Sequence, residues 1–307
     1  MRITQQMISG NAIQHMTDSQ DMMNRLQEKI NSGKAFAVAS DDPVNASISL
    51  GLRSSITQID SYQNTNAQTS SWMDATDFAL QQMDDVGTKA QDLILRGLND
   101  SLGPNERANA LAPDMAGLLQ QALEMGNYKQ EGQYIFSGVY TNTQTFSMDN
   151  TTTPPTVIYN PRPAPPALPP PGINSTLQRT IAPNQNIPIN VMGETSLKPF
   201  IQAISDAQQA LLANDTTALN NALTALQSGV TTMDQARTTT GARMRQVQTA
   251  GDYMDKAQIE AKGLLSQKED ANLAEAITML KSQETTYQAV LQVSQRAMSA
   301  SSLFSMM

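Results

Sequence analysis

The chain has 307 residues, enough for one large domain or two to three smaller ones, and carries a net charge of −8. This acidic balance argues against nucleic acid as a partner, because nucleic-acid binding needs a basic face that neutralises phosphates. The lack of cysteine and the single histidine, His15, exclude disulfides, Cys-based zinc sites and multi-histidine metal sites, so we expect no metal and no cofactor.

Charged residues make up 16% of the chain, below the roughly 25% of an ordinary globular protein. Neutral polar side chains replace them, and such a surface loses its water cheaply, which favours extensive contact between subunits. The start of the chain lacks the apolar segment of a cleavable signal, and no run of 18 apolar residues predicts a membrane span. We therefore expect a cytoplasmic protein or one exported without a cleaved signal, and no contact with a membrane.

Apolar residues at three- and four-residue steps predict a first helix from about Thr4 to Ser32. Gly33 suits the left-handed residue that ends many helices. Asp42 then precedes Pro43, so the carboxylate can cap free amides of a second helix while proline occupies its first position.

From Pro43 a repeat of 3.5 residues continues over seven heptads and predicts a helix roughly 75 Å long. A helix of this length is not stable alone and must lie against partners. Its core-type positions include polar residues, which favours conditional association. These positions are Ile48, Leu52, Ser55, Ile59, Tyr62, Asn66, Thr69, Met73, Thr76, Leu80, Met83, Gly87, Ala90, Ile94 and Gly97.

Helical patterning restarts at Gly103-Pro104, and Pro113 is expected to break or kink it. A further helix should run to about Gly132, where the aromatic-rich segment Gly132–Gly138 predicts a strand or turn. This segment ends the first helical half.

The middle of the chain, residues 139–195, has a different composition. Twelve of the fifteen prolines lie between Pro154 and Pro199. Short alternating runs predict strands at Val157–Tyr159, Leu177–Ile181 and Ile187–Val191, whereas Pro161–Pro171 suits an extended, exposed loop. We expect a small, partly irregular β domain.

Helices resume near Ser196, with a second one from Thr216 toward Ala261 and a last one from about Asp270 to Phe304. The predicted fold is therefore mainly α. It is a long antiparallel helical bundle or coiled coil formed by the N- and C-terminal halves, with a small β-rich and proline-rich inserted domain.

No motif for catalysis is apparent. A glycine-rich phosphate loop and a Gly-x-Ser-x-Gly elbow are both missing from the sequence. The carboxylate pairs Asp41-Asp42 and Asp84-Asp85 lack the oxygen-rich loop that a cation needs, and a helix cap and a solvated helix face explain them better. We expect no enzymatic activity.

Five segments in register resemble the flagellin superfamily and, within it, its hook-associated members. They are the start Met1-Arg2-Ile3-Thr4, the stretch from Ser32-Gly33-Lys34 to Asp41-Asp42-Pro43, GQYIFSG at Gly132–Gly138, Gly241-Ala242-Arg243-Met244, and Glu269–Ala276. Together they cover both helical arms, about two-thirds of the chain. The proline-rich stretch Pro161–Pro171 departs from the family pattern.

The resemblance implies a structural protein of the bacterial flagellum, at the junction of hook and filament, exported without a cleaved signal. It implies hook-associated protein 1, flagellin and a cytoplasmic export chaperone for the C-terminal helix as partners, together with self-association in a ring. The domains expected are an N-terminal assembly helix (1–40), a bundle in two halves (41–138 and 196–265), the insert (139–195) and a C-terminal assembly helix (266–307).

The residues expected to carry assembly are Ile3, Met7, Met16, Leu273, Ile277, Leu280, Leu291 and Met298. Gly33, Asp42 and Pro43 are expected to form the inter-domain turn. Flagellin itself, the filament subunit, is one alternative, and a helical needle-tip or signalling protein of a secretion system is another. An enzyme is the weakest alternative.

Overall fold

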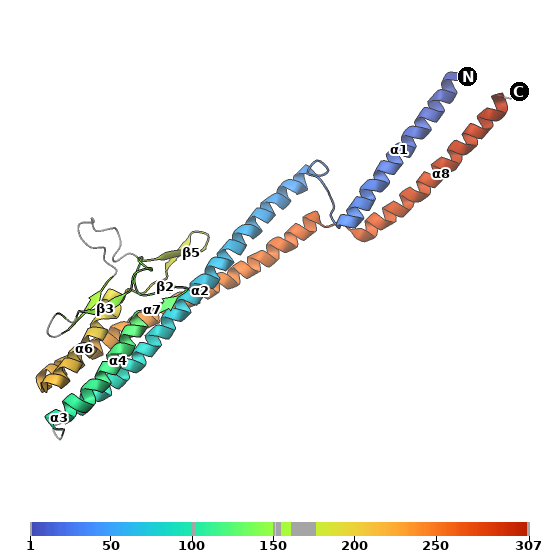
Figure 1. Ribbon diagram of the computed structural model, residues 1–307. Helices are drawn as coiled ribbons and strands as arrows, with labels where there is room; N and C mark the ends of the chain where they lie inside the picture. The colour runs from blue at the N-terminus through green and yellow to red at the C-terminus, as the bar shows by residue number, and fades with distance from the viewer. Residues whose placement is uncertain (1, 100–101, 150, 152–154, 161–175, 306–307) are drawn as a thin grey trace, which may run out of the picture. The chain divides into compact units, whose positions relative to one another are not determined.

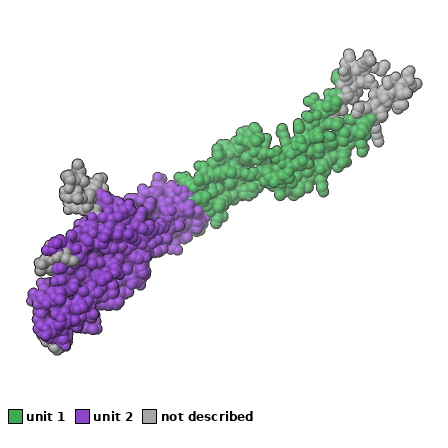
Figure 2. All heavy atoms as spheres, in the orientation of Figure 1, with its two compact units in different colours: residues 1–60, 256–307 green, residues 61–255 purple. Residues whose placement is uncertain are grey.

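The computed structural model describes residues 2–99, 102–149, 151, 155–160 and 176–305. The chain divides into two compact units (Figure 2). The terminal unit comprises residues 1–60 and 256–307, and the core unit comprises residues 61–255. Two long antiparallel helices, α2 (Pro43–Gly97) and α7 (Thr216–Glu269), each contribute to both units (Figure 1).

The heptad pattern of α2 correctly predicts which of its faces is buried in the core unit. Met73, Leu80, Met83 and Ile94 are fully inaccessible to solvent there. The antiparallel partner is α7, because Arg237 of α7 pairs with Asp77 of α2, with 2.9 Å between Nε and Oδ1. In the terminal unit the same pattern is only partly buried, and Ile48 and Ser55 are exposed.

Pro113 does not end the helical segment, but the α-helical pattern is interrupted just before it, as expected from a residue that breaks or kinks a helix. The helical segment α3 (Pro104–Glu106) continues through a π-helical turn, η1 (Arg107–Leu111), into α4 (Ala112–Gly126). Because the proline ring clashes with the carbonyl four residues earlier and provides no N–H, a wider turn before it accommodates the chain. Pro113 then lies in the first turn of α4, where its missing donor costs little.

The expected end of the helix near Gly132 is wrong, since α4 ends at Gly126. Asn127 stops it, because its side-chain amide binds the backbone of Phe146: Nδ2 donates to the carbonyl oxygen and Oδ1 accepts from the amide. A hairpin of β1 (Lys129–Gln130) and β2 (Gln133–Tyr134) follows, with Glu131 and Gly132 both at positive φ. Two such residues form the turn that suits a two-residue hairpin.

The inserted segment contains two further antiparallel ribbons and no wider sheet among the described residues. One pairs β3 (Phe146–Asp149) with β4 (Thr156–Tyr159), and the other pairs β5 (Gln178–Ala182) with β6 (Gln185–Pro188). β4 and β5 confirm the expected runs at Val157–Tyr159 and Leu177–Ile181. The expected run Ile187–Val191 overlaps β6 only at Ile187 and Pro188, because the strand ends at a proline, which cannot donate to a ladder. The expected loop Pro161–Pro171 lies outside the described residues.

The hydrophobic core lies in the core unit, where α4, the ribbons, the short helix α5 (Gly193–Ser196) and α6 (Lys198–Ala213) pack against α2 and α7. Its contiguous cluster of buried side chains begins at Trp72 and ends at Ala250, entirely within that unit. Phe136, Phe146 and Phe200 are fully buried in it.

The terminal unit contains α1 (Arg2–Ser32) and α8 (Leu273–Ser305), which lie side by side with the two chain ends together (Figure 1). We call these two helices the terminal pair. Both confirm helices expected from the sequence. Among the described residues, no helix is both long and apolar enough to cross a membrane, and no three acidic or histidine side chains gather as metal ligands.

A tight contact in the core generates one prediction. A Cβ at Gly229 of α7 would lie 2.8 Å from the Cα of Phe200. Because backbone cannot yield there, Gly229→Ala should lower the free energy of unfolding of the core unit by about 1–3 kcal/mol, measured by denaturant unfolding. The matched control Gly117→Ala, on exposed α4 surface with nothing within 4 Å, should be neutral or slightly stabilising. Equal stability of both variants would contradict the packing.

Candidate assembly interface

The terminal pair buries few of its apolar side chains. Among the described side chains of α1 and α8, Leu26 (7% exposed) and Ala276 (6%) are the only buried apolar ones. A buried polar contact lies between the helices as well, where Gln283 Nε2 donates to Ser19 Oγ over 2.9 Å. Toward the chain ends Met7 is 62% exposed and Val293 66%. Two helices alone therefore leave most of their apolar surface in water.

The residues expected to carry assembly fall into three groups. Met7, Leu273 and Ile277 are exposed, and Met16, Leu280 and Leu291 are half-buried between or beside the helices. The side chains of Ile3 and Met298 lie outside those that the structure describes. The exposed and half-buried groups are thus available for contact with another chain, although their role in assembly stays a prediction.

Sequence reasoning missed a groove on the terminal pair. It has a volume of about 450 Å³, and no Lys, Arg, Asp or Glu side chain lines it. Its walls are Asn11 and His15 of α1 and Thr286, Ala289, Val290, Val293 and Ser294 of α8. Val293 and Ile277 are separated by about 160° around α8 at about 100° per residue, so the groove and the expected stripe lie on different sides of that helix. A helical-wheel projection of α8 would have revealed this second apolar face.

At the inner end of the terminal pair the two connecting segments form a short antiparallel bridge. The amide of Ala35 donates to the carbonyl oxygen of Glu269 over 2.6 Å, and the amide of Ala271 donates to the carbonyl oxygen of Gly33 over 2.8 Å. Gly33 has φ +68°, which confirms the left-handed residue expected after α1. This conformation turns the chain so that its carbonyl meets the other segment.

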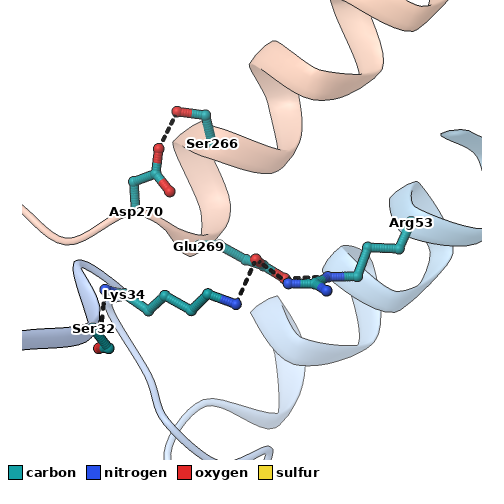
Figure 3. Close-up of polar contacts among 6 residues, drawn as sticks. All are labelled: Ser32, Lys34, Arg53, Ser266, Glu269 and Asp270. Atoms are coloured by element: carbon teal, nitrogen blue, oxygen red, sulfur yellow. Dashed lines mark hydrogen bonds and ion pairs between the residues drawn. The ribbon is translucent and has the colours of Figure 1, made fainter. Parts of the chain in front are cut away.

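Beside this bridge a carboxylate is held by two cations (Figure 3). Glu269, the last residue of α7, is only 8% exposed. Its Oε1 accepts from Nε of Arg53 over 2.8 Å, its Oε2 accepts from Nη2 over 2.6 Å, and Nζ of Lys34 lies 3.6 Å from Oε2. These side chains and the bridge together we call the clasp.

The clasp perturbs the titration of its members. The two hydrogen bonds from Arg53, followed by burial in the opposite sense and the charges of Arg53 and Lys34, hold the pKa of Glu269 below its ordinary value. The same hydrogen bonds raise the pKa of Arg53. A paired, bidentate carboxylate is a strong contact and leaves Glu269 ionised at neutral pH.

The expected cap of α2 is present. Asp42 Oδ1 accepts from the Asn45 amide over 3.0 Å, and Oδ2 accepts from Asn45 Nδ2 over 2.6 Å. The hydrogen bond from the Asn45 backbone amide is the main cause that lowers the pKa of Asp42. Pro43 occupies the first helical position, where its lack of an N–H costs little. Asp42 and Pro43 thus begin α2, and their role as an inter-domain turn stays a prediction.

Comparison with known proteins finds a family model that matches the first part of the chain. Residues 3–141 match the model described as the bacterial flagellin N-terminal helical region. The matched stretch, less than half of the chain, is similar to that region. The match confirms the resemblance to the flagellin superfamily seen in the sequence motifs.

One curated relative is flagellar hook-associated protein 3 of Escherichia coli K12, 30% identical over 148 residues, which are 48% of this chain and 46% of the relative. The chain therefore spans about half the length of the curated relative in this match. The solved structure of a putative flagellar hook-associated protein from Vibrio parahaemolyticus has a TM-score of 0.65 at 16% identity and covers 75% of this chain and all of its own. The flagellar junction protein FlgL from Legionella pneumophila has a TM-score of 0.55 at 13% identity, covering 74% and 100%. These structures confirm the mainly α fold with small strand pairs.

The Asp42 cap generates a prediction about the start of α2. Asp42→Ala should speed hydrogen exchange of the Asn45 amide severalfold, because that amide loses its acceptor. Asp42→Asn, which keeps an oxygen at the same place, should stay near the wild type. Because the folded pKa of Asp42 is lowered, the protection should persist above the ordinary aspartate pKa and disappear as pH falls through the lowered value. Identical exchange in all three proteins would disprove the cap.

Proposed function

We propose that this protein is a structural junction protein of the bacterial flagellum, a counterpart of hook-associated protein 3 that joins hook to filament. The flagellin N-terminal match, the hook-associated relative and the fold shared with a flagellar junction protein support the proposal. It assembles through α1 and α8. Its location is the flagellum, which it reaches by export without a cleaved signal.

The observation that carries the proposal is the contrast between the two units. The core unit seals a continuous cluster of apolar side chains, so it is stable as a single chain. The terminal pair exposes the side chains expected for assembly, including Leu273 and Ile277. Exposed apolar surface on paired helices is stabilised when other helices cover it, and a tubular assembly of copies supplies such helices.

The partners follow from that position. Hook-associated protein 1 would lie on the hook side and flagellin on the filament side, with neighbouring copies in a ring between them. A cytoplasmic export chaperone would cover α8 before assembly. Such a partner suits α8 because its apolar residues stay uncovered in the single chain.

The proposal includes no catalysis. The described carboxylates with lowered pKa values each serve a local contact: Asp42 caps α2, Asp149 accepts from Thr151, and Glu269 belongs to the clasp. The Tyr159 hydroxyl, whose pKa burial raises to about 12, donates to the Phe136 carbonyl oxygen. These groups hold structure and leave no perturbed pair poised for proton transfer among them.

Flagellin, the filament subunit, is the second candidate, since the matching family model describes a flagellin region. Copy number separates the two. A junction protein is present as one ring per flagellum, whereas a filament subunit repeats along the whole filament. Quantitative mass spectrometry of purified flagella distinguishes them.

The exposed stripe of α8 gives a test of assembly. Ile277→Asp should abolish filament attachment and motility in cells whose own copy is deleted, because a charge at a covered apolar site stays unpaired. Removal of residues 273–307 should have the same effect. In both cases the core unit should keep its unfolding transition.

Thr278→Asp is the matched control, since it adds the same charge at the neighbouring exposed position. It should leave attachment nearly normal. Normal attachment with Ile277→Asp, or with the shortened chain, would overturn the assembly role of α8.

Limited proteolysis of the purified monomer gives a second test. The ends of the terminal pair should be trimmed first, because few apolar contacts hold them, and a fragment containing residues 61–255 should resist. Mass spectrometry of the fragments reads the cut sites. Cleavage within the core unit before the terminal pair would contradict this order.

A further inference from the structure

The buried apolar side chains that the structure describes in the terminal pair lie toward the clasp. The buried apolar residues Leu26 and Ala276 lie within a few turns of it, and the Ser19–Gln283 hydrogen bond lies further out. Beyond that bond the described side chains at Met7 and Val293 are more than three-fifths exposed. Full burial of a described apolar side chain is thus confined to the inner half of the pair, whereas Val290 and Leu291 further out are half-buried.

The clasp lies at the inner end of the terminal pair, and it joins three chain segments. Glu269 ends α7, Arg53 belongs to α2, and Lys34 lies two residues after the end of α1. Figure 3 shows the Lys34 and Arg53 side chains converging on the Glu269 carboxylate from different segments. The carboxylate therefore fixes the places where the chain leaves α1 and enters α8.

The two connections need such a fixed point. Between α7 and α8 only residues 270–272 intervene, whereas residues 33–42 separate α1 from α2. Beyond the bridge the longer connection is closed on itself, since Asp41 Oδ2 accepts from the amides of Ala37 and Val38. Without the bridge, the longer connection would let α1 slide along α8 in several registers.

We propose that the clasp nucleates the terminal pair: Glu269 acts as a positioning residue that sets the register of α1 against α8, and the helices zip together outward from it. Formation of a helix has a costly first turn and inexpensive later ones, and the terminal helices have few buried contacts to offset that cost. The clasp supplies the first step with two charge-assisted hydrogen bonds and a backbone bridge. The inference concerns the single chain, and its meaning for assembly rests on the proposed function.

The charge state of Glu269 makes the clasp sensitive to acid. The cations that face the carboxylate are Arg53 and Lys34, and the hydrogen bonds to Glu269 raise the pKa of Arg53. The folded pKa of Glu269 is lowered, so the clasp stabilises the pair above the ordinary glutamate pKa of 4.5 and loses this effect as pH falls through the lowered value.

Hydrogen exchange of the full-length monomer tests the proposal. In the wild type, protection should be highest at the Ala35 and Ala271 amides and the adjoining turns, and should fall toward both chain ends. Glu269→Gln should lower protection about tenfold or more at these two amides and along the terminal pair, given the strength of charge-assisted hydrogen bonds. The core unit should be unchanged.

Glu260→Gln, at an exposed position of the same helix, is the matched control and should exchange like the wild type. Protection factors measured from pH 7 down to pH 3 add a readout that a merely structural side chain would not move. The wild type should lose protection at Ala35 and Ala271 as Glu269 takes up its proton, and Glu269→Gln should show no such step.

Unprotected Ala35 and Ala271 amides in the wild-type monomer would overturn the proposal, as would unchanged protection in Glu269→Gln. These outcomes leave the junction role intact, because that role is tested by attachment of filaments to hooks. If Ile277→Asp loses filament attachment but keeps wild-type exchange at the Ala35 and Ala271 amides, the assembly role of α8 and the role of the clasp are supported independently.

Discussion

The physical constraint behind this molecule is that the two helices of the terminal pair leave apolar side chains uncovered. Each helix has an apolar stripe wider than the seam of a pair, so a third layer must seal it. Within residues 61–255, α4, α6 and the strand ribbons provide that layer, and Met73, Leu80 and Met83 of α2 become fully inaccessible. In the terminal pair no third layer exists among the described residues, and Met7, Ile277 and Val293 remain in water. One chain thus contains both a completed fold and an uncompleted one.

Electrostatics has a role where apolar burial is scarce. In the terminal unit the described buried apolar residues are Leu26, Ile59, Ala261 and Ala276, of which two are alanines. The clasp there buries a carboxylate and satisfies it with a bidentate arginine, a geometry that fixes direction as well as distance. Apolar contact between two stripes tolerates sliding, whereas paired hydrogen bonds do not. Register in this unit therefore depends on charged groups, and stability depends on what covers the apolar side chains.

The sequence predicts those features that are local. The heptads of α2, the cap at Asp42 and the left-handed Gly33 each depend on residues within a few positions, and the structure has all three. The π-helical form of the interruption before Pro113 and the stop at Asn127 were missed because longer-range packing decides them: Asn127 ends α4 by binding Phe146. The Glu269–Arg53 pair joins residues 216 positions apart, and no periodicity relates them. The groove at Val290 and Val293 was missed because only the 3.5-residue stripe of α8 was followed.

The polar residues in the seam of α2 acquire a meaning in this context. Both amide atoms of Asn66 and Thr69 Oγ1, at seam positions, are buried without a hydrogen-bond partner in the described part of the chain, as is Ser49 Oγ next to the seam residue Ile48. A buried polar group left unpaired costs about 1–3 kcal/mol, so this seam is less stable than an apolar one would be. A chain built for maximal stability as a monomer would place leucine or isoleucine there. A polar residue at a core position instead disfavours wrong registers of long helices. Under the proposed junction role, the weak seam and the uncovered terminal pair have one explanation: polar seam residues keep the register of the single chain specific, and burial of the exposed apolar side chains in an assembly would provide stability.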